Sequence, residues 1–410
     1  MIQLLQINSV VNSGSTGRIA EEIGQLAVKN GWKSYIAYGR NERESQSEAI
    51  KIGNERDINW HGVQTRLFDR HGLGSTRATK KFIAKVETLK PDIIHLHNLH
   101  GYYINIRILF EYLARSKIPV VWTLHDCWPI TGHCAYFSFV DCQKWRTQCG
   151  HCPQKRGYPA SYGLDGSSQN YLLKKKVFTS IPSERMVLAV VSHWLDSVIG
   201  DSFLKEFPRK VIYNGIDTKK FSPKDSIELR NRFGIKGRII LLGVATNWSQ
   251  RKGLADYLKL SKILRDDEII ILVGLRNDQI RNLPRNVIGV ERTEDVDELA
   301  SFYSMADIVC NFSVEETFGL TTVEGFACGT PGIVYNCTAS PELITPETGF
   351  VVEQGNITEI RNAIDTIKSK GKSFYAESCR ERAVKMFNKN ERYAEYLELY
   401  DQMLSEKVNK

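Results

Sequence analysis

Two glutamates, Glu316 and Glu324, stand eight residues apart in the chain, with Gly319 and Leu320 between them. The segment that carries them follows residues 306–312, an apolar run that predicts a buried strand, and it continues with helical spacing to a glycine stop. This order predicts that the first carboxylate lies in a strand-to-helix loop and the second about one turn inside the helix. Both carboxylates would then face the crevice beyond the carboxyl end of the strand, where open α/β sheets bind ligands.

The residues between the two glutamates predict an anion site. Backbone N–H groups around Gly319 and Leu320, together with the helix dipole, favour a negatively charged ligand. A carboxylate one turn deeper, at Glu324, can accept two hydrogen bonds from a vicinal diol such as that of a ribose. An anion site next to a diol acceptor describes a nucleotide diphosphate sugar. The competing interpretation is an ordinary helix N-terminus, at which the glutamates only interact with the helix dipole.

A basic pair, Arg251 and Lys252, follows another apolar run at residues 238–245 and precedes Gly253. Negative charge builds on a diphosphate as it leaves, so a cation beside the leaving oxygen stabilises the transition state more than the ground state. We expect Lys252 to provide this cation. Arg251 either assists it or points to solvent.

His125 and Asp126 follow a further strand-like run, residues 119–124, at its carboxyl end. Histidine forms hydrogen bonds and transfers protons near neutral pH, which makes His125 a candidate for contact with the reacting groups. A His–Asp pair that only fixes a loop is the alternative. We expect the nearby His95 and His97 to be buried structural residues, because neighbouring positions on one strand offer poor tetrahedral geometry for a metal.

A glycine-rich turn, residues 12–22, connects the first predicted strand to the first predicted helix. Gly14 and Gly17 have no Cβ, so the backbone there can approach a ligand closely. Arg18 either adds a positive charge to this turn or forms a salt bridge on the helix.

The elements that must hold these residues alternate between strand and helix patterns, which predicts parallel sheets covered on both faces. A chain of 410 residues indicates two domains of about 200 residues each. Glycine, proline and charge interrupt the pattern at residues 214–226, so the boundary is expected there. Strands are expected near residues 2–10, 34–40, 92–97, 119–126, 186–194, 238–245, 268–275, 286–291, 306–312, 331–336 and 349–355.

Taken together, these patterns resemble the Glu-x7-Glu signature of retaining GT-B glycosyltransferases, and of the GT4-like family in particular. Phe318-Gly319-Leu320 and Gly329-Thr330-Pro331 accompany the two glutamates. Residues 214–223 are similar to the linker between the two Rossmann-like halves of GT4 enzymes. The chain departs from the family at Thr246, where an arginine usually precedes the lysine.

The resemblance implies an α/β GT-B fold with two Rossmann-like domains that face an interdomain cleft. Residues 1–216 would form the acceptor-binding domain and residues 217–390 the domain that binds the nucleotide sugar. Residues 391–410 would form a helix that crosses back to the first domain. A hinge near residues 217–224 would close the cleft and exclude water.

The resemblance also implies a role for each site residue. Glu316 would position the donor sugar, Glu324 would bind ribose, and His125 would contact the sugar near the reacting carbon. The residues implied in catalysis are Glu316, His125 and Lys252. The residues implied in donor binding are Gly14, Gly17, Arg251, Lys252, Phe318, Gly319, Leu320 and Glu324.

The implied chemistry is a retaining transfer that requires no metal or other cofactor. No carboxylate in the motifs resembles a dedicated nucleophile, so the leaving phosphate would accept the proton of the acceptor hydroxyl on the same face of the sugar. Metal-dependent glycosyltransferases use an Asp-x-Asp sequence, which occurs here at Asp295 and Asp297. This pair opens a predicted helix and is expected to serve as N-cap and first-turn charge.

Five of the nine cysteines lie in residues 127–152, an insertion in the first domain. Cys149 and Cys152 have the spacing of a zinc knuckle, and Cys134 and Cys142 would complete the four ligands of a structural zinc site. Free thiols and disulfide or redox roles are the alternatives. Colanic-acid-like members of the family, which act in bacterial exopolysaccharide assembly, carry a similar run, so this insertion is expected to shape acceptor recognition.

The net charge of +8 is modest for this length, and basic residues gather at positions 66–85 and 174–176. Solvated helix faces and a surface for anionic lipid headgroups or a lipid diphosphate are the two interpretations. Nucleic acid is not expected as a partner, because no binding motif accompanies the charge. The chain has no export signal or bilayer-spanning run, so we expect a cytoplasmic protein, with peripheral contact at the inner face of the plasma membrane.

The sequence therefore predicts a retaining glycosyltransferase that moves a hexose from a UDP- or GDP-linked sugar to a lipid-linked or oligosaccharide acceptor of a surface polysaccharide. A zinc-stabilised binding protein without catalysis, and another sugar-nucleotide-dependent synthase on the same fold, are the alternatives.

Overall fold

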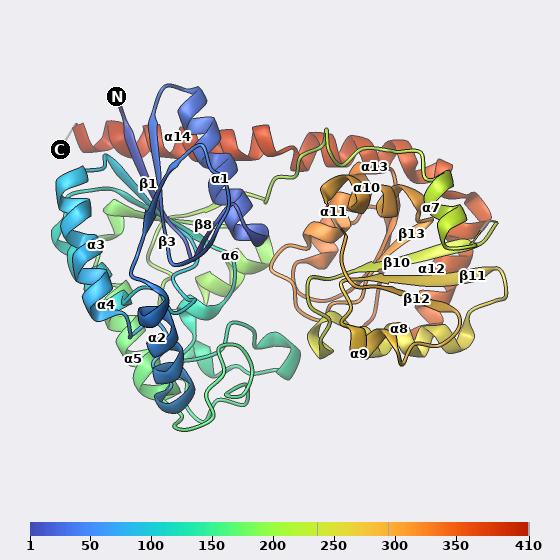
Figure 1. The fold of residues 1–410 in the computed structure, drawn as a ribbon, viewed down its shortest axis with the longest axis horizontal. Helices are drawn as coiled ribbons and strands as arrows, with labels where there is room; N and C mark the ends of the chain where they lie inside the picture. The colour runs from blue at the N-terminus through green and yellow to red at the C-terminus, as the bar shows by residue number, and fades with distance from the viewer. Residues whose placement is uncertain (236, 294, 409–410) are drawn as a thin grey trace. The chain divides into compact units, whose positions relative to one another are not determined.

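The chain forms two compact units, drawn in Figure 1. The computed structural model describes residues 1–235, 237–293 and 295–408. Unit 1 comprises Met1–Tyr213 and Asn390–Lys410, and unit 2 comprises Asn214–Lys389. The boundaries predicted from the sequence lie after residues 216 and 390. The last two positions of its final segment, 409 and 410, lie outside the described residues.

In the described residues, unit 1 is built on a seven-stranded parallel sheet with the order β5-β3-β1-β6-β7-β8-β9. A separate parallel pair joins β2 and β4. The strands are β1 (Gln3–Ile7), β2 (Val10–Val11), β3 (Lys33–Tyr38), β4 (Arg40–Glu42), β5 (Glu48–Lys51), β6 (Ile93–Leu96), β7 (Val120–Leu124), β8 (Met186–Val190) and β9 (Arg209–Val211). The α-helices are α1 (Gly14–Lys29), α2 (Glu55–Phe68), α3 (Thr76–Leu89), α4 (Ile106–Arg115), α5 (Ser167–Phe178), α6 (His193–Gly200) and α14 (Lys389–Val408).

Unit 2 has a six-stranded parallel sheet in its described part, with the order β12-β11-β10-β13-β14-β15. The strands are β10 (Ile239–Val244), β11 (Glu268–Val273), β12 (Val287–Val290), β13 (Ile308–Asn311), β14 (Gly332–Tyr335) and β15 (Gly349–Val352). The α-helices are α7 (Ile227–Arg232), α8 (Leu254–Leu260), α9 (Asn277–Ile280), α10 (Val296–Met305), α11 (Leu320–Ala327), α12 (Ile357–Lys370) and α13 (Lys372–Phe387). Parallel sheets interleaved with helices confirm the predicted α/β class.

Among the described residues, no helix combines the length and the apolar composition that crossing a membrane requires. The predicted helix N-cap at Asp295 is confirmed, because its side chain accepts a hydrogen bond from the backbone N of Glu298 (2.8 Å) at the start of α10. Asp297 forms an ion pair with Lys224. Both residues of the Asp-x-Asp sequence therefore have structural partners within unit 2.

The C-terminal helix α14 packs on the sheet of unit 1, as the resemblance implies (Figure 1). Its residues Tyr393, Tyr396, Leu397 and Tyr400 recur at helical spacing and are buried. They join one apolar cluster with residues of α1, such as Ile23, and with residues of the central strands. The hydrophobic effect of this burial ties the end of the chain to its beginning.

Two tyrosine hydroxyls of α14 also form hydrogen bonds inside the sheet. The hydroxyl of Thr123 donates its proton to the hydroxyl oxygen of Tyr396 (3.0 Å). Oγ1 of Thr123 therefore accepts a hydrogen bond from Nε2 of His95 (2.7 Å). The hydroxyl of Tyr400 then donates to the remaining nitrogen, Nδ1 of His95 (2.6 Å). Burial lowers the pKa of His95 well below its usual value, which keeps the ring neutral.

Residues 174–176 are predicted to form an exposed basic cluster, and this prediction is wrong for Lys174. Lys174 is buried on the inner side of α5, where its Nζ donates to the carbonyl oxygens of Trp128 (2.7 Å) and Thr131 (2.9 Å). The ammonium also lies 3.5 Å from the centre of the Trp128 ring, a cation–π contact. Lys175 and Lys176 are exposed. Successive residues of a helix point in different directions, so the three adjacent lysines do not share one environment.

The docking of α14 leads to a stability prediction. Tyr400→Phe removes the hydroxyl that donates to Nδ1 of the buried His95, and we expect the free energy of unfolding to fall by about 1–3 kcal/mol. Urea unfolding followed by circular dichroism measures the change. Tyr162→Phe, at a tyrosine of the same unit that is 65% exposed, is the control and should leave the stability unaltered. Equal stability of both variants would contradict the assigned hydrogen bond.

Candidate active site

Unit 2 has its topological switch point between β10 and β13. The chain runs outward from these two neighbouring strands in opposite directions, to β11 and β12 on one side and to β14 and β15 on the other. Because the strands are parallel, their carboxyl ends lie along one edge, and ligands of open α/β sheets bind outside that edge at the switch point. Lys252 follows β10 and Glu316 follows β13, so the topology brings the predicted cation and the first glutamate to this point.

An ion pair joins these two loops. The ammonium of Lys252 contacts Oε1 of Glu316, and 21% and 14% of the two side chains are exposed. Burial alone would raise the pKa of Glu316. The charges of Lys252 and Arg251, together with hydrogen bonds from Lys252 and Ser313, outweigh burial and lower that pKa below its usual value. The carboxylate is therefore ionised at neutral pH and can accept hydrogen bonds from the hydroxyl groups of a sugar.

Backbone contacts hold the two loops together. The guanidinium of Arg251 donates to the carbonyl oxygen of Glu315 (2.6 Å), and the Arg251 carbonyl accepts from the backbone N of Val314 (2.9 Å). Gly253 has φ +71°, and a Cβ there would lie 2.1 Å from the carbonyl oxygen of Phe312. Only glycine permits this approach. Arg251 is thus bonded to the loop after β13 rather than directed to solvent alone.

The second glutamate, Glu324, lies on α11 one turn after the helix begins, as the sequence predicts. Its side chain is buried, and Oε2 accepts a hydrogen bond from the hydroxyl of Tyr303 (2.8 Å). Tyr303 is held in turn through its carbonyl oxygen, which accepts from the hydroxyl of Thr330 (2.6 Å). Glu324 therefore has a fixed orientation, as a residue that recognises a diol requires.

The three residues before and at the start of α11 differ in what they offer a ligand. Gly319 is the N-cap of the helix in a left-handed conformation, with φ +105°. Leu320 is half-buried and opens the helix. The Phe318 ring is buried, and its centre lies 5.7 Å from that of Phe387 on α13. The side chain of Phe318 therefore anchors the loop, and the predicted donor contact of this residue stays a prediction for its backbone atoms.

Sequence reasoning missed residues that position Glu316 from the neighbouring strand. The backbone N of Glu316 donates to the hydroxyl of Thr338 (2.9 Å), and its carbonyl accepts from the backbone N of Ala339 (3.2 Å). Both partners follow β14, next to β13 in the sheet. The sequence does contain a signal for Thr338 and Ala339, because both follow the carboxyl end of a predicted parallel strand.

In unit 1, His125 ends a chain of hydrogen bonds across three adjacent strands, β1, β6 and β7. Nε2 of Gln6 donates to the carbonyl of Ala20 (2.7 Å). This fixes the orientation of the Gln6 amide, so Oε1 of Gln6 accepts from Nε2 of His97 (3.0 Å). Because burial lowers the pKa of His97 well below its usual value, that ring is neutral and its Nδ1 is an acceptor. Nε2 of His125, 3.1 Å from this Nδ1, therefore carries the proton.

The electrostatic environment keeps His125 neutral. Burial lowers its pKa to about 4, against an opposing effect of the Asp126 carboxylate. Asp126 accepts from the His100 ring (2.7 Å) and from the backbone N of Trp128 (2.9 Å), and these partners hold it in place. His125 consequently offers hydrogen bonds rather than a positive charge at neutral pH.

The predicted glycine-rich turn is partly wrong, because α1 begins at Gly14 and includes Gly17. A Cβ on Gly17 would lie 2.9 Å from Cγ2 of Val10 and 3.2 Å from the backbone N of Asn12. Gly17 thus lets α1 pack on its own preceding segment and does not offer open backbone to a ligand. Gly14 has φ +62° and open space where a Cβ would be, which suits close approach of a ligand.

The cysteines that the sequence assigns to zinc line one cavity of unit 1. All nine cysteines of the described structure are free thiols, so the alternative of a disulfide is not observed. Within the described residues, no group of three or more histidine, cysteine, aspartate or glutamate side chains is already arranged to hold a metal ion. Zinc binding therefore stays a prediction. The four residues concerned are Cys134, Cys142, Cys149 and Cys152.

Comparison with protein families gives two matches, which together cover most of the chain. Residues 16–220 match the family described as Glycosyltransferase Family 4, and residues 236–369 match the family described as Glycosyl transferases group 1. The second match contains the ion pair, the switch point and both glutamates.

Two bacterial proteins are among the relatives of this chain. The chain is 28% identical over 233 residues to WcaC of Escherichia coli K12, which its name assigns to colanic acid biosynthesis as a glycosyl transferase. That match covers 53% of this chain and 55% of WcaC, about half of each. An uncharacterized 41.2 kDa protein in the cps region of Klebsiella pneumoniae is 23% identical over 405 residues, which cover 94% of this chain and 96% of that protein.

Solved structures share the fold over almost the whole chain. Sucrose-phosphate synthase from Thermosynechococcus elongatus superposes with a TM-score of 0.73 and 16% identity, covering 99% of this chain and 100% of that one. HepE of Anabaena in complex with UDP-glucose superposes with a TM-score of 0.68 and 15% identity, covering 98% and 100%. The match to these glycosyltransferase structures confirms the predicted GT-B fold.

The histidines predict how acid affects the two units. All nine histidines lie in unit 1, and burial lowers the pKa of five of them, to about 4 for His61 and His125. In the unfolded chain these histidines have a pKa of about 6.5, so they bind protons below that pH, whereas in folded unit 1 they stay neutral. The stability of unit 1 therefore falls as the pH drops from about 6.5 toward about 4. The other three histidines of this set are His71, His95 and His97.

Unit 2 contains no histidine and serves as the internal control. Hydrogen exchange with mass spectrometry at pH 7 and 5, corrected for intrinsic exchange rates, reports on each unit separately. We expect unit 1 to lose protection at pH 5 while unit 2 keeps it. Loss of protection in unit 2 first would show that the histidines do not control the acid response.

Proposed function

Because this chain belongs to the group 1 glycosyltransferases of family 4, we propose that it is a retaining hexosyltransferase that uses a UDP- or GDP-linked sugar. The observation that carries this proposal is the ion pair of Lys252 and Glu316 at the switch point of unit 2. A purely structural helix N-terminus does not require a half-buried ammonium paired with a half-buried carboxylate on two separate loops. The UDP-glucose complex of HepE is consistent with a uridine donor.

In the proposed reaction, the bond between the anomeric carbon and the diphosphate breaks as the acceptor oxygen attacks the same face of the sugar. The proton of the acceptor hydroxyl passes to a phosphate oxygen of the leaving group. Lys252 offsets the negative charge that develops on that group. Glu316, ionised and held by Thr338, orients the hydroxyl groups of the transferred sugar.

Glu324 would bind the ribose diol, because its carboxylate is fixed on α11 one turn behind the proposed diphosphate position. The start of α11 at Gly319 and Leu320 would contribute backbone N–H groups to the diphosphate. Neutral His125 would hydrogen-bond to the transferred sugar, and Gly14 would let the backbone approach the donor phosphates. Arg251 would add a second positive charge beside Lys252. No divalent metal takes part in this proposal.

We place the acceptor with unit 1 and assign it to a lipid-linked oligosaccharide of a surface polysaccharide. The names of WcaC, a colanic acid enzyme, and of RfbU, an O-antigen chain mannosyltransferase of Salmonella typhimurium, support this class of product. An acceptor of this class carries a diphosphate and a lipid, so an enzyme that uses it gains from a surface that contacts an anionic membrane.

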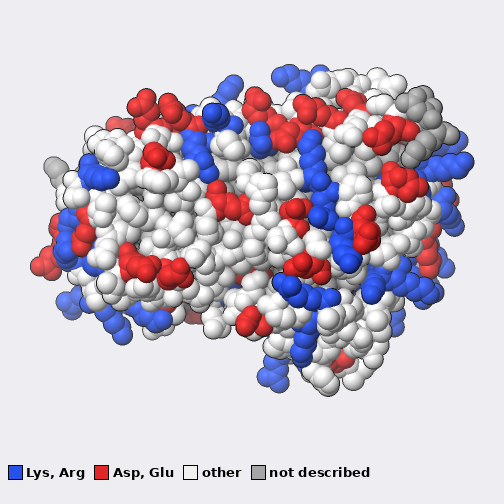
Figure 2. Space-filling view, turned by 180° about the vertical axis from the view of Figure 1, so that it is seen from behind, with Lys and Arg blue, Asp and Glu red and all other residues white. Residues whose placement is uncertain are grey.

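The surface of unit 1 offers both charge and apolar area for such contact. Helix α3 exposes Arg77, Lys80, Lys81 and Lys85 on the side opposite its buried apolar residues. On the face drawn in Figure 2, basic and acidic side chains lie interspersed among wide areas of other residues.

Helix α2 adds an exposed apolar stripe to this surface. Trp60, Val63 and Leu67 recur at spacings of three and four residues along one face and are 60%, 39% and 49% exposed. The backbone N of Leu164 donates to the carbonyl of Leu67 (2.9 Å), which brings the exposed Leu164 next to this stripe. A tryptophan with leucines and arginines nearby is typical of a helix that lies at a membrane interface.

The proposed function predicts a large effect of one side chain. Lys252→Ala should slow sugar transfer by roughly two to three orders of magnitude, because it removes a preorganised charge at the leaving group. Steady-state assays with the sugar nucleotide that most raises the melting temperature measure the effect, and EDTA should leave wild-type activity unchanged. Lys259→Ala, at a lysine whose side chain is 66% exposed on α8, is the matched control.

Two outcomes would count against the reaction proposed for this site. Full activity of the Lys252 variant would remove the cation from the mechanism. Failure of every UDP- and GDP-linked sugar to bind the wild-type protein would favour a binding protein without catalysis.

The acceptor assignment predicts binding to anionic vesicles. Replacing Lys80, Lys81 and Lys85 with glutamine should release the protein, since each basic residue near an anionic surface contributes about 1 kcal/mol. Co-sedimentation with phosphatidylglycerol and phosphatidylcholine vesicles measures this. The triple replacement of Lys219, Lys220 and Lys262, exposed lysines of unit 2, makes the same change in charge and should have little effect.

Transfer to a short soluble acceptor should survive in both triple variants. Equal sedimentation of the wild type with anionic and neutral vesicles would instead identify a soluble acceptor.

A further inference from the structure

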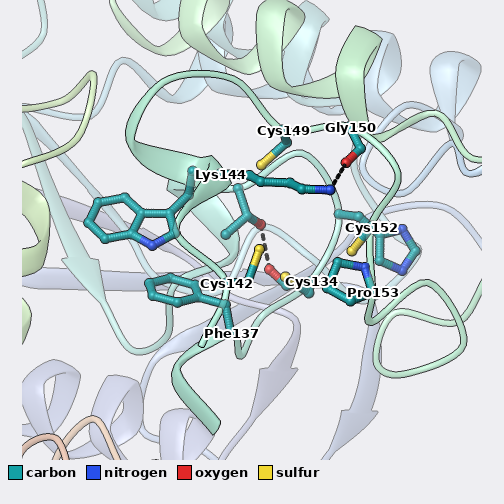
Figure 3. A pocket seen from close by; sticks show the side chains of 11 residues that line it. Cys134, Phe137, Cys142, Lys144, Cys149, Gly150, Cys152 and Pro153 are labelled. Atoms are coloured by element: carbon teal, nitrogen blue, oxygen red, sulfur yellow. Dashed lines mark hydrogen bonds between the residues drawn. The ribbon is translucent and has the colours of Figure 1, made fainter. Parts of the chain in front are cut away.

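A cavity in the Cys-rich segment of unit 1 is lined by none of the residues proposed for catalysis or donor binding. Figure 3 shows the four cysteine side chains that enter it, all of them free thiols. The cavity wall also includes His133 and Thr131. The residues that supply the thiols are Cys134, Cys142, Cys149 and Cys152.

Short turns and backbone hydrogen bonds bring these cysteines together in a segment without long helices or strands. Single 3-10 turns precede Cys134, Cys142 and Cys149. Nζ of Lys144 donates to the carbonyl oxygens of Gly150 (2.8 Å) and of the following residue (3.1 Å), which closes the loop up to the last cysteine. The sulfur of Cys149 already accepts a hydrogen bond from the backbone N of Gly132 (3.2 Å).

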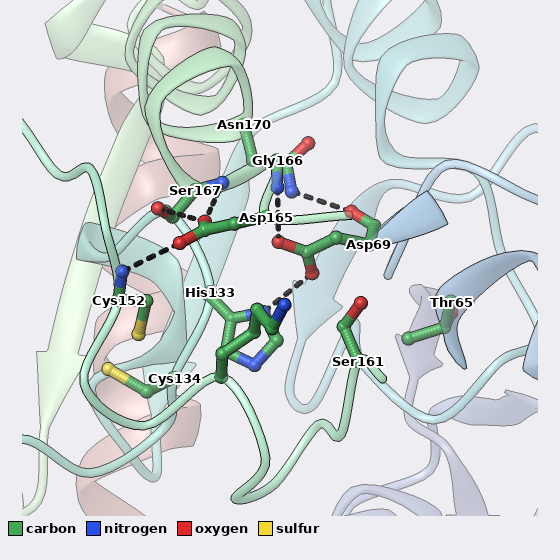
Figure 4. A network of polar contacts seen from close by, with 12 residues as sticks. Thr65, Asp69, His133, Cys134, Cys152, Ser161, Asp165, Gly166, Ser167 and Asn170 are labelled. Atoms are coloured by element: carbon green, nitrogen blue, oxygen red, sulfur yellow. Dashed lines mark hydrogen bonds and ion pairs between the residues drawn. The ribbon is translucent and has the colours of Figure 1, made fainter. Parts of the chain in front are cut away.

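A buried histidine of the cavity wall has an unused nitrogen. Nδ1 of His133 lies 2.5 Å from a carboxylate oxygen of Asp69, and both side chains are fully buried. Figure 4 shows Asp69 between this ring and the backbone N of Gly166, 2.9 Å away. In the described structure, Nε2 of His133 is buried and has no hydrogen-bond partner. A carboxylate that orients an imidazole in this way is common around protein-bound metals.

A buried cation lies behind the same wall. The ammonium of Lys174 donates to the carbonyl of Thr131, a residue that lines the cavity. Among the described residues, no carboxylate forms an ion pair with this ammonium. Burial disfavours the charged form of Lys174 and negative charge at Cys149 or Cys134 favours it, so this arrangement favours thiolates in the cavity. Four thiolates around a zinc ion carry two net negative charges and would supply this negative charge.

We propose that Cys134, Cys142, Cys149 and Cys152 bind one structural zinc ion as thiolates. Zinc displaces the thiol protons, and each sulfur forms one bond to the metal in a tetrahedral arrangement. The thiols are not yet arranged around one point, so binding requires cysteine side chains to change their χ1 rotamers toward the centre of the cavity. Because Nδ1 of His133 donates to the Asp69 carboxylate, its Nε2 carries a lone pair in the neutral ring. This inference does not depend on the proposed transferase activity.

The zinc content of the purified full-length protein tests the proposal. We expect about one zinc ion per chain in the wild type and in Cys337→Ser, a half-buried cysteine of unit 2 that serves as the control. The double variant Cys149→Ser, Cys152→Ser should contain less than about one tenth of that amount. Cobalt added to chelator-treated wild type should give the near-ultraviolet charge-transfer absorption of thiolate ligands.

Thiol counting on the wild type provides a test that does not depend on how a variant folds. Zinc added to the chelator-treated protein should protect four of the nine thiols from a thiol reagent, and a chelator should release them. The proposal is overturned if the treated protein binds neither zinc nor cobalt. It is equally overturned if zinc protects no thiols, or if the double variant retains its zinc.

Discussion

The parallel register of β10 and β13 is the constraint on which the candidate site depends. Leu241 pairs with Ile308 and Leu242 with Val309, so the two strands end at the same edge of the sheet. The loops that follow these strands start from this shared edge, and there Lys252 of one loop meets Glu316 of the other. No local pattern in either loop could produce this contact alone, because 64 residues separate Lys252 from Glu316.

The ion pair itself is a poor source of stability. Removing two charges from water costs free energy, and the attraction between the charges roughly offsets this cost. Replacement of such a pair by apolar residues is often neutral or stabilising. The surrounding contacts nevertheless preserve the pair, since Gly253 allows a backbone approach that no other residue permits and Thr338 bonds the backbone of Glu316. Such contacts orient charges in advance of a reaction in which charge moves.

The sequence predicts the alternation of elements, the loop position of Glu316 and the helical position of Glu324, because each rests on hydrophobic periodicity and on residues that end helices. It fails where a side chain's environment comes from distant segments. Phe318 looks like part of a ligand loop until α13 covers it, and Lys174 belongs to a basic run until the helix period turns it inward. Gly17 is a packing glycine because β2 lies against α1.

The two units differ in the polar groups that they bring to the candidate site. Unit 2 places ionised groups at its switch point, whereas unit 1 buries neutral imidazoles whose tautomers are set by partners such as Gln6 and Thr123. A diphosphate that gains charge requires fixed cations, and a hydroxyl group on a sugar requires only a directed donor or acceptor. This difference is consistent with the proposed binding of the donor by unit 2. In unit 1, His125 can direct a neutral hydroxyl without competing for the diphosphate.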